Sequence, residues 1–192
     1  WKSINESDMK LMPDLESGYL DPFYSEKTYC LHCNVVEPES GKLYGRDPRS
    51  TAIKAEEYLK KTKIGTKAFF GPEAEFFLFD DVKFSNAMNK VSFEVDAIDA
   101  AWNTDTSYEM GNMGHRPGVK GGYFPVNPTD AGQDIRSEML STMKRMGMKV
   151  DKHHHEVASC QHELGLIFDS LKVQADNLQK YKYVIQNVAH SY

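Results

Sequence analysis

The sequence predicts a fold that mixes helices with strands, of the α+β or α/β class. Residues 27–36 alternate apolar and polar side chains, and residues 67–80 are rich in phenylalanine, which is typical of strands. A helix start signal stands between these two runs. Residues 129–148, and the residues from 170 onward, carry apolar side chains at helical spacing. The chain therefore contains several elements of both kinds.

Composition and charge narrow the class of protein. The chain has 192 residues, 40% hydrophobic and 27% charged, which is typical of globular proteins. A net charge of −5 leaves no basic face for nucleic acid. No apolar run is long enough to span a membrane, and the polar start does not resemble a signal peptide. We expect no nucleic-acid or membrane partner and a cytoplasmic location. Because the chain begins at Trp1 rather than Met, we expect that a preceding part is missing.

The three cysteines suggest a reducing compartment. An odd, sparse count gives no disulfide framework. Cys30 and Cys33 have the spacing of zinc and redox sites, but residues three apart on one strand point to opposite faces. We therefore interpret both as ordinary strand residues.

The first 65 residues contain two strands and a helix. The segments expected ahead of the helix are an irregular start (1–20), a strand (27–36), a turn (37–41) and a short strand ending at residue 44. In the helix, Asp47 is the N-cap, Pro48 takes the first helical position and Gly65 ends it. A domain boundary just before this helix divides the chain into domains 1–45 and 46–192.

A long loop follows the phenylalanine-rich strand. Residues 103–128 hold five glycines without a sustained period, and a loop this long inside a domain is usually functional or disordered. The predicted helix over residues 129–148 then ends at Gly147. Its apolar stripe consists of Ile135, Met139, Met143 and Met146.

The remaining residues predict a hairpin over 150–168 and a helix from about residue 170. That helix has no stop signal before residue 192, so we expect the polypeptide to continue. Its apolar stripe consists of Leu171, Ala175, Leu178, Tyr181, Ile185 and Val188.

The segment FGPEAEFF (residues 70–77) is the first candidate site. On a strand, Glu73 and Glu75 lie on the same face, where their charges repel each other and resist desolvation. A bound cation would relieve both costs. A strand end that emerges into water would explain the pair equally well.

The segment HHHEVASCQHE (residues 153–163) is the second. If Ser159 and Cys160 form a two-residue turn, Glu156 lies directly opposite Glu163. Like charges so placed are destabilising without a cation between them. An oxygen-rich ligand set favours Mg²⁺ or Mn²⁺ over Zn²⁺, and Mg²⁺ commonly accompanies phosphates.

Other sites fit the sequence less well. A zinc site at the histidine run is disfavoured, because adjacent histidines on a strand alternate faces and the helical HExxH spacing is absent. A solvated histidine-rich edge would not explain the paired carboxylates. The GVKGG segment (residues 118–122) lacks the spacing of a phosphate loop, and Cys160 beside histidines is a weak signal for a nucleophile.

Seven segments together resemble type I glutamine synthetases in order and approximate spacing. They are NESDM (5–9), RDPR (46–49), FGPEAEFF (70–77), GHRP (114–117), KGGYFP (120–125), DIRSE (134–138) and HHEVA (154–158). The resemblance implies an α+β fold, with a partial β-grasp domain before the first half of a catalytic domain built on an antiparallel half-barrel sheet. It also implies that the start of the first domain and the second half of the catalytic domain are missing, so that the segment alone is inactive.

The resemblance also implies roles for individual residues. Glu73 corresponds to a ligand of the metal that holds the ATP phosphates, whereas Glu75, Glu156 and Glu163 correspond to ligands of the metal near the glutamate carboxylate. Tyr123 and Glu156 correspond to residues that line the ammonium pocket. The residues that correspond to nucleotide contacts are His154, Phe168 and Asp151, the last where many members have Glu.

The implied reaction is the ATP-dependent joining of ammonia to glutamate through a γ-glutamyl phosphate, with Mg²⁺ or Mn²⁺. The implied assembly is a dodecamer of two hexameric rings with active sites between subunits. One alternative is a ligase that joins glutamate to another amine, such as a polyamine. A catalytically silent ring subunit and a metal-binding module without catalysis are the others.

Overall fold

A computed structural model describes residues 8–102, 109 and 114–192. The predicted start of the chain and the predicted 103–128 loop therefore fall partly outside the described residues. The chain divides into two compact units, each described by itself. Unit 1 comprises Trp1–Pro72, Thr142–Lys149 and Leu166–Asn187, and unit 2 comprises Glu73–Ser141, Val150–Gly165 and Val188–Tyr192.

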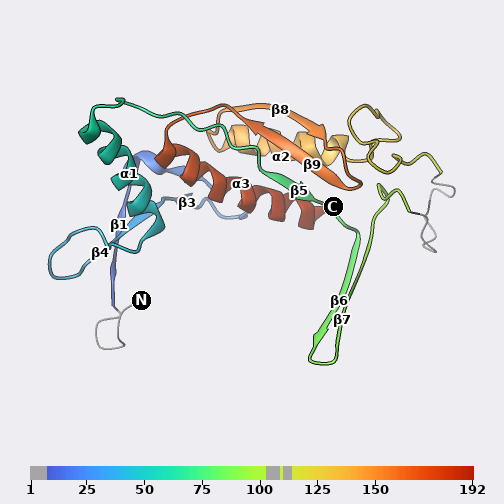
Figure 1. Cartoon of the computed structure of the whole chain (residues 1–192), viewed down its shortest axis with the longest axis horizontal. Coiled ribbons are helices and arrows are strands. Elements are labelled where there is room, and N and C mark those ends of the chain that lie inside the picture. The colour runs from blue at the N-terminus through green and yellow to red at the C-terminus, as the bar shows by residue number, and fades with distance from the viewer. Residues whose placement is uncertain (1–7, 103–108, 110–113) are drawn as a thin grey trace. The chain divides into compact units, whose positions relative to one another are not determined.

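Unit 1 begins with short antiparallel strand pairs (Figure 1). Strand β1 (Lys10–Pro13) pairs with β4 (Cys33–Val36), and β2 (Tyr19–Leu20) pairs with β3 (Tyr29–Cys30). A 3₁₀ turn, η2 (Leu15–Ser17), lies between β1 and β2 in sequence. The predicted strand over residues 27–36 is thus two strands. The strand is interrupted at His32, because the backbone of this residue makes its hydrogen bonds outside the two strand pairs. Its carbonyl accepts from the Asp14 amide (2.9 Å), and its amide donates to Ser17 Oγ (2.8 Å).

The three cysteines are free thiols. Cys30 ends β3, with its sulfur 3.9 Å from Asp21 Oδ2, and Cys33 begins β4, with its sulfur 3.9 Å from the Leu31 carbonyl. Cys160, in unit 2, is fully buried. The Cys-x-x-Cys pair therefore lies on two strands with different partners, not on the single strand that the pattern predicted.

Helix α1 (Pro48–Thr62) starts where the sequence predicts. The Asp47 side chain caps it by accepting from the Ser50 amide (2.9 Å), and Pro48 is its first residue. The helix ends earlier than expected, at Lys63 rather than Gly65. Lys63 takes the left-handed conformation (φ 61°) and its amide donates to the Lys60 carbonyl, which closes the last turn.

A buried ion network ties the N-terminal strands to two helices within unit 1. Arg49, in α1, donates to both carboxylate oxygens of Asp176, which lies in α3 (Leu171–Ser191). The same guanidinium donates to Asp14 and to Asn34. Lys172 adds a second cation to Asp14 at 2.9 Å. Because bidentate pairs have a fixed geometry, Arg49 fixes the register of these segments.

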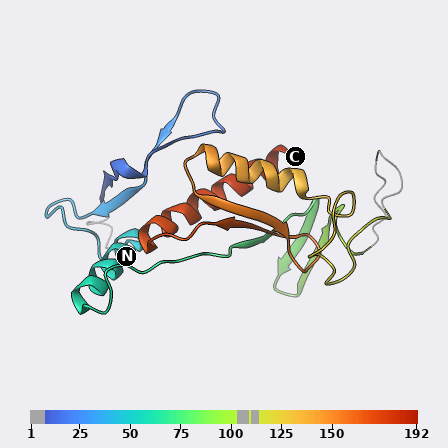
Figure 2. The same cartoon turned by 90° about the horizontal axis from the view of Figure 1, so that it is seen from above.

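Unit 2 contains a three-stranded antiparallel sheet in the order β5–β9–β8, with β5 (Glu75–Phe77), β8 (Val150–His155) and β9 (Gln161–Leu166). The predicted strand over residues 67–80 is reduced to β5, because only those residues pair with β9. Helix α2 (Gln133–Arg145) accompanies this sheet as far as Ser141 (Figure 2), and its residues from Thr142 onward belong to unit 1. As predicted, Gly147 follows α2 with a positive φ (82°), and Met139, Met143 and Met146 are buried.

A two-stranded ribbon in unit 2 has no counterpart among the predicted elements. It consists of β6 (Asp81–Ala87) and β7 (Lys90–Asp96). Phe84 pairs directly with Phe93, and their exposed fractions are 81% and 79%. The ribbon thus carries an exposed apolar face. Among the described residues, no helix combines the length and apolar character needed to cross a membrane.

Candidate functional site

Three of the predicted site residues converge in unit 2. Ligand atoms of His154, Glu156 and Glu163 all lie within 4.8 Å of one another. His154 Nδ1 is 3.5 Å from Glu156 Oε1, and His154 Nε2 is 3.6 Å from Glu163 Oε2. Both glutamates are buried. We call these three residues the acidic cluster.

The β8–β9 connection brings the cluster together by a different route from the predicted one. Strand β8 ends at His155 and β9 begins at Gln161, so the connection is residues 156–160 rather than a two-residue turn. The Glu156 amide donates to the Gln161 carbonyl (2.8 Å), and the predicted direct pairing of Glu156 with Glu163 is therefore wrong. The two-residue turn does not form, because Ser159-Cys160 is not one of the glycine-containing dipeptides that such turns favour.

Glu163 instead pairs across the sheet with Glu75. The sequence predicted a cross-strand pair of carboxylates that would be destabilising without a cation. The pair exists, but it joins Glu163 to Glu75 rather than to Glu156. The Glu75 carboxylate also accepts a hydrogen bond from Gln161 Nε2 (2.5 Å). Glu73 lies just before β5 and is exposed, as Glu75 is. All four predicted metal glutamates thus belong to unit 2.

The burial and the charges around the Glu163 carboxylate indicate whether a cation would be favoured at the acidic cluster. Burial raises the pKa of Glu163, and the nearby charges of Glu156 and Glu73 raise it further, while His154 opposes them. The carboxylate oxygens suit Mg²⁺ or Mn²⁺, whereas the imidazole of His154 suits Zn²⁺ better. A divalent cation would remove the repulsion that these carboxylates impose on one another, so the donor set fits the predicted metal.

Tyr123 lies beside Glu156, as predicted for the two ammonium-pocket residues. The negative charge of Glu156, together with a hydrogen bond to it, raises the pKa of Tyr123. Gly122 permits this approach: its amide donates to the Val157 carbonyl (3.2 Å), and a Cβ at Gly122 would lie 1.9 Å from the Glu156 carbonyl oxygen. Any side chain at Gly122 would therefore displace the chain that carries Tyr123.

The predicted nucleotide residues belong to both units. His154 lies in the acidic cluster. Asp151 is an exposed residue of β8. Phe168 belongs to unit 1, where it is 61% exposed and its ring meets Phe69 edge-on at 5.4 Å. Their contact with nucleotide stays a prediction.

A buried aspartate, Asp99, lies next to the acidic cluster and was not among the predicted site residues. Asp99 Oδ2 lies 2.6 Å from His155 Nε2 and accepts from the Cys160 amide at 3.1 Å. His155 Nδ1 lies 2.5 Å from the Glu156 carbonyl oxygen, so both ring nitrogens face acceptors, an arrangement that favours the protonated ring. Burial lowers the pKa of His155, but these two hydrogen bonds outweigh it and raise the pKa. No motif marks Asp99 in the sequence.

A second buried group supports β9 from α2. Arg136 is 1% exposed and forms a bidentate pair with Asp130, and its Nη1 lies 3.0 Å from His162 Nδ1. Burial, and then the charge of Arg136, lowers the pKa of His162 to about 4, so His162 is the neutral acceptor. One sequence signal was available: Arg136 stands three and seven residues before Met139 and Met143, on the apolar face of α2.

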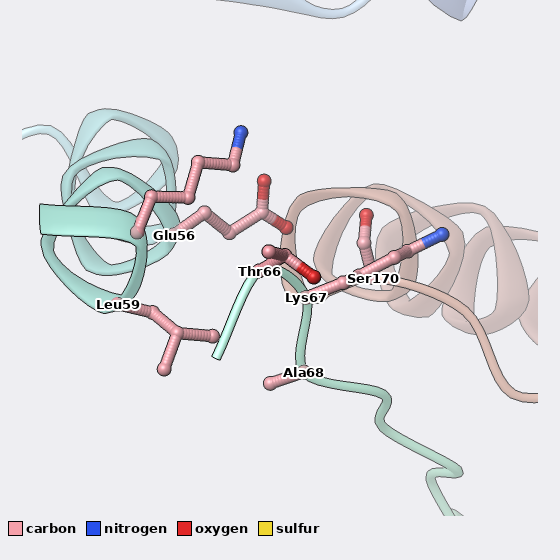
Figure 3. Close-up of a pocket in the computed structure, with 7 residues that line it drawn as sticks. Glu56, Leu59, Thr66, Lys67, Ala68 and Ser170 are labelled. Carbon is pink, nitrogen blue, oxygen red and sulfur yellow. The ribbon is translucent and has the colours of Figure 1, made fainter. Parts of the chain in front are cut away.

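Unit 1 has a cavity of about 190 Å³, and none of the predicted site residues line it. Figure 3 shows its lining. The Glu56 carboxylate beside it accepts from the Lys172 amide (2.9 Å) at the start of α3, and Lys67 Nζ lies 3.4 Å from Asp169. The residues that line the cavity are Glu56, Leu59, Lys60, Thr66, Lys67, Ala68 and Ser170. The charged groups of Glu56 and Lys67 thus already have partners.

Comparisons with known proteins agree with the resemblance. Residues 45–192 match the family described as "Glutamine synthetase, catalytic domain", and residues 1–38 match "Glutamine synthetase, beta-Grasp domain". The chain is 69% identical over 189 residues to a glutamine synthetase of Cereibacter sphaeroides, covering 98% of this chain and 40% of that protein. It is also 69% identical over 192 residues to one from Rhodobacter capsulatus, covering all of this chain and 44% of that protein.

A solved structure agrees as well. The cryo-EM structure of Plasmodium falciparum glutamine synthetase superposes with a TM-score of 0.88 at 26% identity, over 99% of this chain and 37% of that one. This chain spans less than half the length of these relatives. The predicted α+β fold, with a β-grasp segment ahead of part of a catalytic domain, is confirmed. Sequence and fold together show that this chain belongs to the glutamine synthetase family.

Proposed function

We propose that this chain is part of an enzyme that joins ammonia to glutamate at the expense of ATP, through a γ-glutamyl phosphate. The observation that carries the proposal is the acidic cluster, with Glu75 paired to one of its members. In a family whose relatives are named glutamine synthetases, buried carboxylates of this kind are best explained as metal ligands.

The residues divide into two metal-binding sets. Glu75, Glu156 and Glu163 would hold one Mg²⁺ or Mn²⁺ ion near the glutamate carboxylate, and Glu73 would contribute to a second ion near the ATP phosphates. When bound, the ions would neutralise the charge that builds on the transferring phosphoryl oxygens.

The ammonium pocket and the nucleotide contacts complete the proposed site. Glu156 favours the ammonium cation by its charge and accepts its proton, while Tyr123 lines the same pocket. The charge of Glu156 and a hydrogen bond to it raise the pKa of Tyr123, which supports placing both side chains in one pocket. His154, Phe168 and Asp151 contact the ATP.

The proposal extends to assembly and location. Because the chain spans only 40% and 44% of two relatives, we propose that it acts within a longer polypeptide of the same family. That polypeptide forms a homo-oligomer, a dodecamer of two hexameric rings with active sites between subunits, in the cytoplasm. The exposed apolar face of the β6–β7 ribbon supports assembly, since such faces commonly mark protein contacts.

The test is phosphate release from ATP by the full-length protein, with glutamate and ammonium omitted in turn. We expect release to need both substrates and a divalent metal. Glu163→Gln should lower turnover by at least about 100-fold, because one metal ligand loses its charge. Glu57→Gln, the same change on the exposed face of α1, is the matched control.

Other outcomes would replace the proposal. Release that requires a polyamine in place of ammonium would identify a different γ-glutamyl ligase. If an assembled, metal-loaded protein turned over no amine at all, the chain would belong to a silent ring subunit.

A further inference from the structure

A single buried carboxylate oxygen holds both ends of the connection that carries the acidic cluster. Asp99 Oδ2 contacts His155 Nε2 (2.6 Å), on the last residue of β8, and the Cys160 amide (3.1 Å), on the residue before β9. Asp99 is 6% exposed and His155 is 3% exposed. Glu156 directly follows the first contact, and Glu163 lies three residues beyond the second.

The backbone around Asp99 is fixed by contacts of its own. The Ile98 amide donates to Asp80 Oδ2 (2.6 Å), and the Ala100 amide donates to the Ala97 carbonyl (3.1 Å). One residue further on, the Ala101 amide donates to Ser159 Oγ (3.3 Å), inside the β8–β9 connection. These hydrogen bonds hold the turn that presents Asp99 to the β8–β9 connection.

The connection itself needs such a support. Cys160 has a positive φ (64°) without being glycine, which is an uncommon and mildly strained conformation. Its side chain packs with Ala97 and Ala100 in a small buried group, and its amide has Asp99 as acceptor. Loss of that acceptor removes the hydrogen bond that holds Cys160 in this conformation.

We propose that Asp99 is a positioning residue that sets the separation between Glu156 and Glu163 through His155 and the Cys160 amide. This inference rests on the proposed function, because the two glutamates are taken as ligands of one metal ion. Asp99 does not touch the metal. It presents the two carboxylates at the spacing that the ion requires, as residues behind the ligands do in other metal sites.

The test is Mn²⁺ binding to the full-length protein, measured by the electron paramagnetic resonance signal of free and bound Mn²⁺. Asp99→Asn should weaken the affinity by about 10- to 100-fold. It should also change the spectrum of the bound ion, which a general loss of stability would not do. Asp81→Asn, the same change on the exposed β6 strand, should do neither.

A double-mutant cycle tests the route through His155. If Asp99 acts through this ring, Asp99→Asn should cost clearly less affinity in a His155→Gln background than in the native protein. Equal losses in both backgrounds would contradict that route. Thermal unfolding of each variant identifies any that fail to fold.

Two failures are distinguishable. If the native protein binds Mn²⁺ and a folded Asp99→Asn variant binds it equally well with the same spectrum, the positioning role is wrong and the proposed function stands. If the native protein binds no Mn²⁺, the proposed metal centre fails, and the role of Asp99 fails with it.

Discussion

Arg136 shows how one buried side chain supports a site that it does not enter. It is almost fully buried, and its charge is balanced by Asp130 while it orders His162, the neighbour of Glu163 on β9. A buried ion pair adds little stability beyond well-packed apolar groups, but a buried charge that has lost its partner is costly.

Arg136→Ala should therefore lower the free energy of unfolding by about 3–5 kcal/mol, because Asp130 is left buried without a cation. Urea unfolding followed by circular dichroism measures this change. Lys144→Ala, an exposed change on the same helix, should shift stability by less than about 0.5 kcal/mol. Equal effects of the two variants would show that Asp130 is not desolvated.

Cys160 should be the least reactive of the three thiols. Burial raises the pKa of Cys160 to about 12, and its side chain has no exposed area. Cys30 and Cys33 are only half-buried. In an Ellman titration of the native full-length protein at pH 8, Cys160→Ser should remove one slowly reacting thiol and leave the fast phase unchanged. In guanidinium the same variant should lose one thiol of ordinary reactivity. A Cys160→Ser variant that loses a fast thiol in the native state would contradict the assignment.

At the scale of the element, the ion network around Arg49 makes unit 1 sensitive to acid. Hydrogen bonds from Arg49 and then Lys172 hold the pKa of Asp14 well below its ordinary value, more than burial raises it. A lowered folded-state pKa contributes stability that is present above the unfolded-state pKa and is lost as the pH falls through the folded-state value. The contribution should therefore decline below about pH 4.

Asp14→Asn should lower the stability of unit 1 at neutral pH and flatten its decline in acid. Unfolding midpoints between pH 2 and pH 7 measure both effects. Asp8→Asn, an exposed change near the same strand, should leave the acid slope as it is. If Asp14→Asn keeps the native slope, other carboxylates cause the acid sensitivity.

The elements also show which parts of the fold the sequence could predict. The start of α1, the end of α2 and the position of α3 follow from local signals: Asp47 with Pro48, Gly147 and an apolar stripe. Strand lengths were less predictable, since β5 extends only where β9 pairs with it. Such pairing is non-local, and no residue within the segment records it.

The same distinction holds for the candidate site. The spacing of the glutamates predicted that carboxylates would gather and need a cation. It did not predict the partner of Glu163. The five-residue connection changes the register between β8 and β9, and Glu75 reaches Glu163 from β5, a strand on the other edge of β9 and far from it in sequence. The role of Asp99 could not be predicted, because Asp99 contacts His155 and Cys160 from a turn that is more than 50 residues away in sequence.

At the scale of the whole molecule, the β6–β7 ribbon bears on the proposed assembly. Its cross-strand pairs place Phe84, Phe93 and Val91 on the exposed apolar face, whereas Lys83 and Glu94 lie on the other face. Apolar side chains this exposed are costly in water unless another surface covers them.

Replacing Phe84 and Phe93 together by Ser should therefore shift the full-length protein toward smaller species, since a contact between copies loses its apolar area. Mass photometry measures the distribution. Lys83→Ser with Glu94→Ser, on the opposite face of the same strands, is the matched control. An unchanged distribution in the phenylalanine variant would exclude the ribbon from the assembly contacts.

The sheet order has a consequence for folding during synthesis on the ribosome. Within the part of the chain that the structure describes, β5 pairs with β9 alone, and β9 is translated after β6, β7, α2 and β8. Throughout that interval Phe76 and Phe77 are synthesised but have no strand to pair with. Nascent chains with unpaired apolar edges are vulnerable to aggregation. Carboxylates that flank this stretch would keep it hydrated until β9 emerges, so Glu73 and Glu75 would protect the nascent chain before they serve any metal.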